Sequence, residues 1–296
     1  MRCANALGKA LRTRLNEILE EAGTLSLDEI KRNDGLKSNI LTDPLFSLEI
    51  ISGDSFKITA NPNDICRSIL RDYYYGHERL MSQWESTSLL VREQKTAWAL
   101  VSAYYCSFFG AIEALRIFGN HALSLTKQEA DAIFRPAGGQ FFSKIVEKRN
   151  FRGVISADFS EIGYTSTGDK PHQAAWKQLN EKVLSFIPSS SNAWSDVLKF
   201  SNMCAGKGGW ESPSDIRNRW NYRDSIYFST LGNNSQNPFL KIIQEEEVAS
   251  SWIRGQFSIR SENDSAASIA ALAKLMHSAM KDSYDFGFLS AKTISS

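Results

Sequence analysis

Residues 96–118 read TAWALVSAYYCSFFGAIEALRIF, and this stretch decides the fold. Apolar side chains recur in it at steps of three and four residues and also fill positions between, so a helix over 92–118 is apolar nearly all round. Such a helix is typical of the centre of a helical bundle. Its charge-free part, residues 96–112, is shorter than the roughly 20 residues that cross a bilayer. We therefore expect a buried helix and no membrane span.

Much of the remaining sequence also has helical spacing. The ranges with this pattern are 4–22, 26–32, 65–86, 127–134, 140–149, 171–184, 193–203, 216–222 and 266–284. Alternating apolar residues on both sides of Gly53-Asp54 instead predict a β-hairpin over 45–60, whereas residues 153–171 are polar and glycine-rich. The sequence therefore predicts a mainly α-helical protein with a small N-terminal β-hairpin. In this prediction residues 1–64 form a helix-plus-hairpin extension, and residues 65–296 form the bundle.

The composition narrows the classes of function. The chain has 296 residues, 34 Lys and Arg against 33 Asp and Glu, and a formal net charge of +1, which excludes a globally basic nucleic-acid-binding protein. Its four cysteines form no CxxC pair and its four histidines no HExxH or HxH spacing, so we expect reduced thiols, no metal site and no cofactor. No signal peptide is evident, and we expect a cytoplasmic protein.

The densest group of potential ligand-binding side chains lies at residues 217–223, which read RNRWNYR. On a helix, Arg217 and Asn221 share one face, and so do Asn218 and Tyr222. Guanidinium groups suit phosphate, amides suit base edges or sugar hydroxyls, and aromatic rings stack on bases. The candidate nucleic-acid-binding residues are Arg219, Trp220, Asn221 and Arg223. The alternative is a surface helix with polar i,i+4 contacts and its tryptophan buried in the bundle.

The segment at 97–109, AWALVSAYYCSFF, resembles the YYSxF-type central helix of HEPN domains. Residues 171–176 (PHQAAW) and then the Arg217-Asn218…Tyr222 segment follow in the order in which this family would place them. The resemblance covers roughly residues 65–290 and implies an up-and-down helical bundle that forms a homodimer. Active family members are metal-independent endoribonucleases that serve as toxins or in antiviral defence. The resemblance therefore also implies RNA as a ligand, and an antitoxin or a defence complex as a partner.

The resemblance also assigns catalytic residues. Arg217 matches the family's arginine, Asn218 matches the polar residue after it, and Tyr222 stands where the family has a histidine. In the family, two protomers contribute this motif across their interface. A tyrosine with a pKa of about 10 is a poor base for a 2′-hydroxyl proton, although it still donates hydrogen bonds and stacks. Either catalysis is lost and binding is retained, or a distant histidine enters the site, for which His172 is the strongest candidate.

Three hypotheses about function stay open at this level. The first is a metal-independent endoribonuclease of a toxin–antitoxin or anti-phage defence system. The second is a catalytically silent HEPN-like subunit that binds RNA, a nucleotide or a protein within a larger defence complex. The third is a helical scaffold unrelated to nucleic acid, whose binding would depend on exposed apolar patches and not on Arg217.

Overall fold

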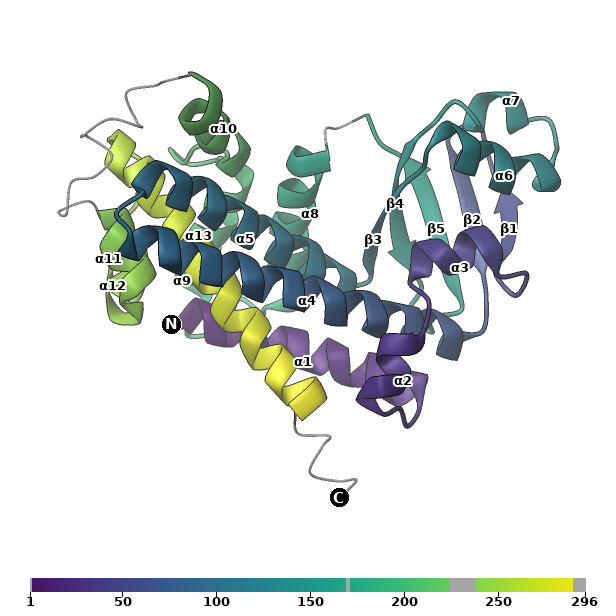
Figure 1. Cartoon of the computed structure of the whole chain (residues 1–296), viewed down its shortest axis with the longest axis horizontal. Helices are drawn as coiled ribbons and strands as arrows, with labels where there is room; N and C mark the ends of the chain where they lie inside the picture. Colours follow the sequence, from purple (N-terminus) through teal and green to yellow (C-terminus); the bar gives the residue numbers. More distant parts are fainter. Residues whose placement is uncertain (1, 169–170, 224–237, 290–296) are drawn as a thin grey trace. The chain divides into compact units, whose positions relative to one another are not determined.

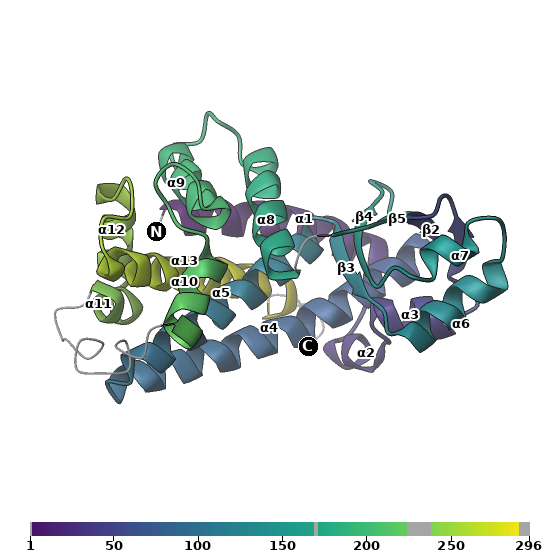
Figure 2. The same cartoon turned by 90° about the horizontal axis from the view of Figure 1, so that it is seen from above.

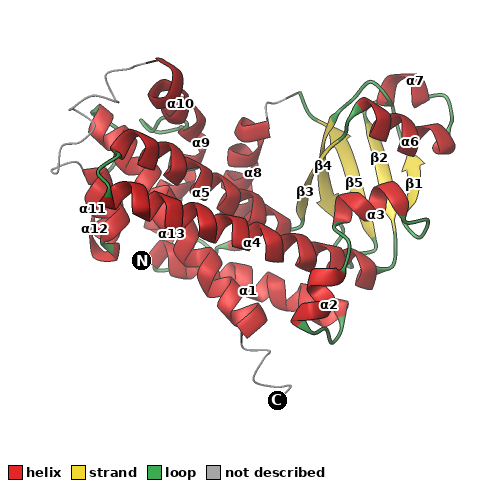
Figure 3. Ribbon diagram, in the orientation of Figure 1, coloured by secondary structure: helices red, strands yellow, loops and turns green. Residues whose placement is uncertain are grey.

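A computed structural model of the chain describes residues 2–168, 171–223 and 238–289 (Figure 1). Within these ranges the helices are α1 (Arg2–Ala22), α2 (Leu27–Arg32), α3 (Leu36–Thr42), α4 (Pro62–Arg92), α5 (Thr96–Ile117), α6 (Lys127–Ala137), α7 (Phe142–Ile145), α8 (Pro171–Phe186), α9 (Trp194–Ala205), α10 (Pro213–Asn218), α11 (Pro238–Gln244), α12 (Glu246–Gly255) and α13 (Glu262–Tyr284), with π-helical turns η1 (Arg219–Arg223) and η4 (Asp285–Leu289). The strands are β1 (Ser47–Ile50), β2 (Ser55–Thr59), β3 (Asn120–Ser124), β4 (Asn150–Ile155) and β5 (Glu161–Ser166) (Figure 3). The prediction of a mainly helical protein is confirmed.

The contacts between residues divide the chain into two compact units. The helical unit takes the described residues of 1–13, 76–114 and 172–296, and the sheet unit takes 14–75 and 115–171. Helices α1, α4 and α5 each contribute residues to both units. This division differs from a boundary after residue 64, which stays a prediction.

All five strands belong to one antiparallel sheet in the sheet unit, in the order β1-β2-β5-β4-β3 (Figure 3). The predicted hairpin strands β1 and β2 do pair, with Leu48 opposite Ile58, but they are part of a larger sheet, because Ile58 also pairs with Ile162 of β5. Residues 153–171, expected to be a polar passage, hold β5 and part of β4. Their alternation is hidden because an inward-facing position of β4 is Gly153.

The glycine at that position makes room for an aromatic core. A Cβ on Gly153 would lie 2.6 Å from the ring of Tyr164 on the neighbouring strand. Tyr164 stacks on Phe56 with ring centroids 4.8 Å apart, and Phe56 also meets Phe134 at 5.1 Å and Phe151 at 5.0 Å. These rings are fully buried, so three strands and helix α6 share one hydrophobic core.

A buried polar pair lies beside this core. His121 on β3 and Tyr164 are both buried, and Nδ1 of His121 lies 2.7 Å from the Tyr164 hydroxyl. Burial lowers the pKa of His121 to about 4 and raises the pKa of Tyr164 well above its ordinary value. Both groups are therefore neutral at pH 7, and their hydrogen bond satisfies two polar groups inside the sheet unit.

The helical unit is built around α5 and α13. Helices α11 and α12 pack against α13 (Figures 1 and 2), and Arg12 of α1 pairs with Asp282 near the end of α13 at 2.6 Å. Helix α5 is long and apolar enough to cross a membrane by length and composition, but 78% of its most apolar window is buried. That burial is what the core helix of a soluble protein shows, and it confirms the expected buried helix.

Candidate functional site

The predicted site begins at a short helix whose start is encoded locally. Pro213 occupies the first turn of α10, where its missing N–H costs nothing, and the helix ends at Asn218. The chain then continues as the π-turn η1, so the α-helical spacing that predicted Arg217 with Asn221 on one face does not extend past Asn218. Helix α10 itself places Arg217 and Asn218 side by side.

Arg217 is 9% exposed, and its guanidinium is held by hydrogen bonds and by two neighbouring aromatic rings. Its Nη1 donates to Oδ1 of Asn218 at 2.7 Å, and its Nη2 donates to the Tyr105 hydroxyl at 3.1 Å. Its guanidinium carbon lies 5.2 Å from the ring centroid of Tyr104 and 5.3 Å from that of Tyr105. The aromatic rings of α5 therefore stabilise this buried positive charge by cation–π contact.

His172, in the first turn of α8, reaches the same place. Its Nδ1 lies 2.8 Å from the hydroxyl of Tyr104, and its ring stacks on Phe108 with centroids 4.1 Å apart. Partial burial lowers the pKa of His172 below its ordinary value, and the charge of Arg217 lowers it further. At neutral pH His172 is thus an unprotonated imidazole near a fixed guanidinium.

Tyr104 connects the helices that carry these groups. Its hydroxyl lies 2.8 Å from His172 on α8 and 3.4 Å from Oγ of Ser214 on α10, so both helices lie beside α5 (Figure 2). Burial raises the pKa of Tyr104, so it stays a neutral phenol. Because Tyr104 is fully buried, it orients His172 from behind and does not meet a ligand itself.

The other predicted binding residues are placed differently. Arg219 makes two hydrogen bonds to Glu211, at 3.1 and 2.7 Å, and an ion pair with Glu262 at 3.0 Å. Trp220 is 2% exposed, which matches the alternative of a tryptophan buried in the bundle. Asn221 is partly exposed in η1. The side chains of Tyr222 and Arg223 lie outside the described part of the chain.

The residues that sequence analysis missed are on α5. Tyr104 and Tyr105 were interpreted only as core residues, although a Tyr-Tyr pair carries two hydroxyls that need partners when a helix is buried. The Tyr104 hydroxyl forms a hydrogen bond with His172, and the Tyr105 hydroxyl accepts one from Arg217. The imidazole of His172 stacks on the ring of Phe108. We call Arg217, Asn218, His172, Tyr104 and Tyr105 the Arg–His cluster.

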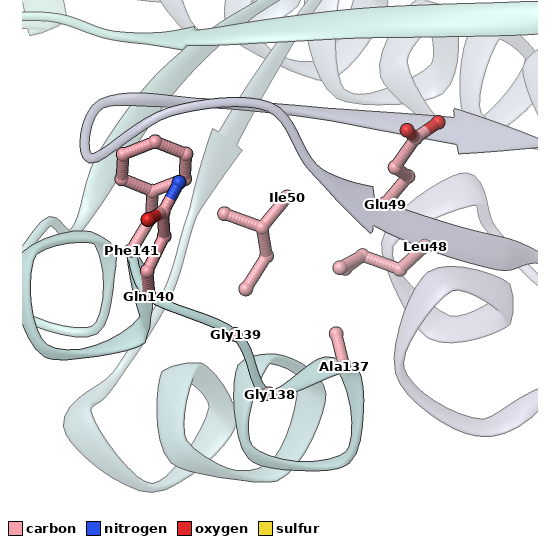
Figure 4. Close-up of a pocket in the computed structure, with 8 residues that line it drawn as sticks. All are labelled: Leu48, Glu49, Ile50, Ala137, Gly138, Gly139, Gln140 and Phe141. Carbon is pink, nitrogen blue, oxygen red and sulfur yellow. The ribbon is translucent and has the colours of Figure 1, made fainter.

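The sheet unit contains a separate hollow of about 210 Å³ (Figure 4). Edge strand β1 lines it with Leu48, Glu49 and Ile50, opposite the chain at 137–141, which includes two consecutive glycines. None of the predicted site residues lines it. Within the described ranges, no three His, Cys, Asp or Glu side chains are grouped so that they could hold a metal ion.

Comparison with known proteins assigns neither a family nor a function to the chain. No family model matches the sequence, no curated protein is similar to it, and no solved structure matches it.

Proposed function

We propose that this chain is a HEPN-like RNA-targeting protein that acts as a metal-independent endoribonuclease in a toxin–antitoxin or anti-phage defence system. The observation that supports this most is the Arg–His cluster, in which a neutral histidine and a fixed arginine meet on the central aromatic helix. The family resemblance expects an arginine, a polar residue and a histidine. Here we assign those roles to Arg217, Asn218 and His172, in place of Tyr222.

The proposed reaction uses His172 as general base. In the reactive tautomer Nδ1 carries the proton and donates it in a hydrogen bond to the Tyr104 oxygen, so Nε2 is free to remove the proton from a ribose 2′-hydroxyl. The 2′-oxygen then attacks the adjacent phosphorus, the bond from phosphorus to the 5′-oxygen breaks, and a solvent water gives a proton to the leaving oxygen. The products are a 2′,3′-cyclic phosphate and a free 5′-hydroxyl.

Arg217 would stabilise the transition state. Negative charge grows on the phosphoryl oxygens as the 2′-oxygen attacks, and a guanidinium oriented in advance stabilises it without reorganisation. Asn218 and Tyr105 supply that orientation through the bonds at 2.7 and 3.1 Å. Tyr104 is a positioning residue, because it fixes the ring of His172 and remains buried.

The test is cleavage of a 5′-labelled RNA in the presence of EDTA. We expect the wild type to cleave, and Arg217→Ala and His172→Ala each to lose roughly 10²–10⁴-fold in rate, the usual contribution of a general base or an oriented charge. The matched controls are Arg260→Ala, which removes an exposed arginine, and His277→Ala, which removes a partly exposed histidine outside the cluster. Both should retain the wild-type rate.

Two results would overturn the assignment. Equal cleavage by wild type and Arg217→Ala would show that another protein produces the activity. Cleavage of an RNA whose ribose at the cut site lacks the 2′-hydroxyl would exclude the proposed attack. Light scattering tests the expected homodimer, and a monomer that cleaves at full rate would count against a site shared between protomers.

The burial of Arg217 supports a second candidate, a catalytically silent binding subunit of a defence complex. A guanidinium that is 9% exposed and bonded at both terminal nitrogens can attract a phosphate by its charge while leaving little of its surface open to the reacting oxygens. This candidate predicts RNA or partner binding without cleavage. It also predicts that the double variant Arg217→Ala/Asn218→Ala loses that binding.

A further inference from the structure

Helix α5 exposes a single line of side chains within the helical unit. From Thr96 to Ala114 every residue is buried except Trp98, Tyr105, Phe109 and Ile112. These positions are separated by seven, four and three residues, which at 100° per residue keeps them within an arc of roughly 60° on the helix. We call these four residues the aromatic line.

The chemistry of this line is unusual for a surface. The exposed face of a core helix is ordinarily polar or charged, yet here it carries three aromatic rings and an isoleucine. Trp98 is 54% exposed, and Tyr105, Phe109 and Ile112 are partly exposed. An apolar line of this kind indicates a binding surface, because its side chains are kept in contact with water at a cost in free energy.

Two arginines lie against the rings of the line. The guanidinium carbon of Arg79, whose side chain is 50% exposed, is 4.1 Å from the ring centroid of Phe109. Arg217 lies 5.3 Å from the ring centroid of Tyr105. The carboxylate that pairs with Arg79, Glu113, is fully buried, so the solvent-facing charge here is positive. Aromatic rings alternating with guanidinium groups are typical of surfaces that bind single-stranded nucleic acid.

The aromatic line is long enough for several nucleotides and passes the Arg–His cluster. Trp98 and Phe109 are eleven residues apart, or roughly 16 Å along a helix, which a strand with a rise of about 3.4 Å per nucleotide would cover with about five nucleotides. Tyr105 lies between them and accepts the hydrogen bond from Arg217 at 3.1 Å. A strand on this line would therefore pass directly over the Arg–His cluster.

We propose that the aromatic line is a binding track for unpaired nucleic acid, on which bases stack on Trp98 and Phe109 while Arg79 and Arg217 meet the phosphates. As the binding site of a substrate it rests on the proposed function, and it adds that the substrate is single-stranded. A second copy of the chain suits this surface less well. A twofold contact over this surface would place the arginines of both copies in one interface, and like charges brought close together repel each other.

The test is fluorescence anisotropy with a labelled 10-nucleotide oligodeoxynucleotide, which cannot be cleaved because it lacks 2′-hydroxyls. We expect Trp98→Ala and Phe109→Ala each to weaken binding roughly tenfold, from the usual contribution of one stacked base, and Trp98→Phe to restore most of the affinity. Phe257→Ala is the matched control, because this aromatic residue is 70% exposed outside the line. It should bind within about twofold of wild type on the same basis.

Salt dependence and duplex competition sharpen the test. Two phosphate contacts give a slope of log K against log salt of roughly −1.4 for a single strand. A steeper slope would indicate a diffuse basic patch and would overturn the stacking track. A duplex of the same length should compete poorly, because its bases are already stacked on one another.

The outcomes separate this inference from the proposed function. Unchanged affinity in both Ala variants, or equal loss in Phe257→Ala, overturns the track, as does a wild type that binds no oligonucleotide. A change of oligomeric state in Trp98→Ala with unchanged affinity assigns the surface to a second copy instead. Binding that depends on the line in a chain that cleaves no RNA supports the track and removes the ribonuclease. If Trp98→Ala cleaves RNA with an unchanged KM, the result supports the ribonuclease and overturns the track.

Discussion

The buried His121–Tyr164 pair predicts how the stability of the protein depends on pH. Burial lowers the pKa of folded His121 to about 4 from an ordinary value of 6.5, so between these values the unfolded chain binds a proton that the folded chain does not. Above pH 6.5 both states are neutral and the pair contributes fully. As the pH falls below 6.5, the free energy of unfolding decreases by about 1.36 kcal/mol per pH unit, and the total loss is roughly 3 kcal/mol by pH 4.

His121→Asn is the perturbation that isolates this effect. An asparagine has its Oδ1 at the position of the imidazole Nδ1, so it can still accept a hydrogen bond from Tyr164, but it does not titrate. The variant should be less stable than wild type at pH 7.5, because it leaves part of the ring volume empty, and the difference should shrink steadily from pH 6.5 to pH 4.5. His277→Asn is the control, and its difference from wild type should not narrow in this way.

The assay is urea unfolding followed by circular dichroism at several pH values. All seven tryptophans lie in the helical unit, so tryptophan fluorescence recorded in parallel reports on that unit alone and shows whether the two units unfold together. Other titrating groups cancel when the variant is subtracted from wild type at each pH. A difference that stays constant from pH 7.5 to pH 4.5 would refute the reasoning.

Three further predictions concern other parts of the molecule. In nuclear magnetic resonance titrations the pKa of His172 should lie below 6.5 and rise in Arg217→Gln, because the nearby charge is removed; no rise would place the two groups further apart. Arg219→Ala should lower the free energy of unfolding by about 1–3 kcal/mol through its lost ion pairs and leave nucleic-acid affinity unchanged, whereas a loss of affinity would support its predicted binding role. Gly153→Ala should destabilise by about 1–3 kcal/mol because its Cβ meets an aromatic ring, whereas Gly163→Ala, which meets nothing within 4 Å, should not, and equal effects in thermal unfolding would contradict this.

The long helices were predictable because their patterns are long. Helices α4, α5 and α13 each span 22 residues or more, so apolar side chains repeat at steps of three and four over many turns. The sheet was largely missed because its strands are four to six residues long, and a pattern with a period of two needs more residues to stand out. Gly153 at an inward position removed one of the few apolar side chains that would have marked β4.

The candidate site was predictable only in part for a related reason. Arg217 and Asn218 are adjacent in sequence, so a local pattern could find them. Tyr105 lies 112 positions before Arg217 and is joined to it only by tertiary packing. Interpreting the aromatics of α5 as core residues was right for Tyr104, which is fully buried, but it missed Trp98, which faces solvent. Aromatic rings occur on both faces of α5, and only the surrounding helices determine which of them are covered.

The interleaved order of the two units sets when each can fold during synthesis. The sheet unit is complete once residue 171 has been made, whereas the helical unit needs the first residues, the middle of the chain and α13 together. The ion pair of Arg12 with Asp282 forms only after roughly 110 more residues, which at 5–20 residues per second takes roughly 5–20 s. Until then α1 lacks this partner and α13 is incomplete, so the nascent chain exposes the apolar side chains that α13 covers in the complete helical unit. A chain truncated before α13 should therefore be bound by chaperones or degraded.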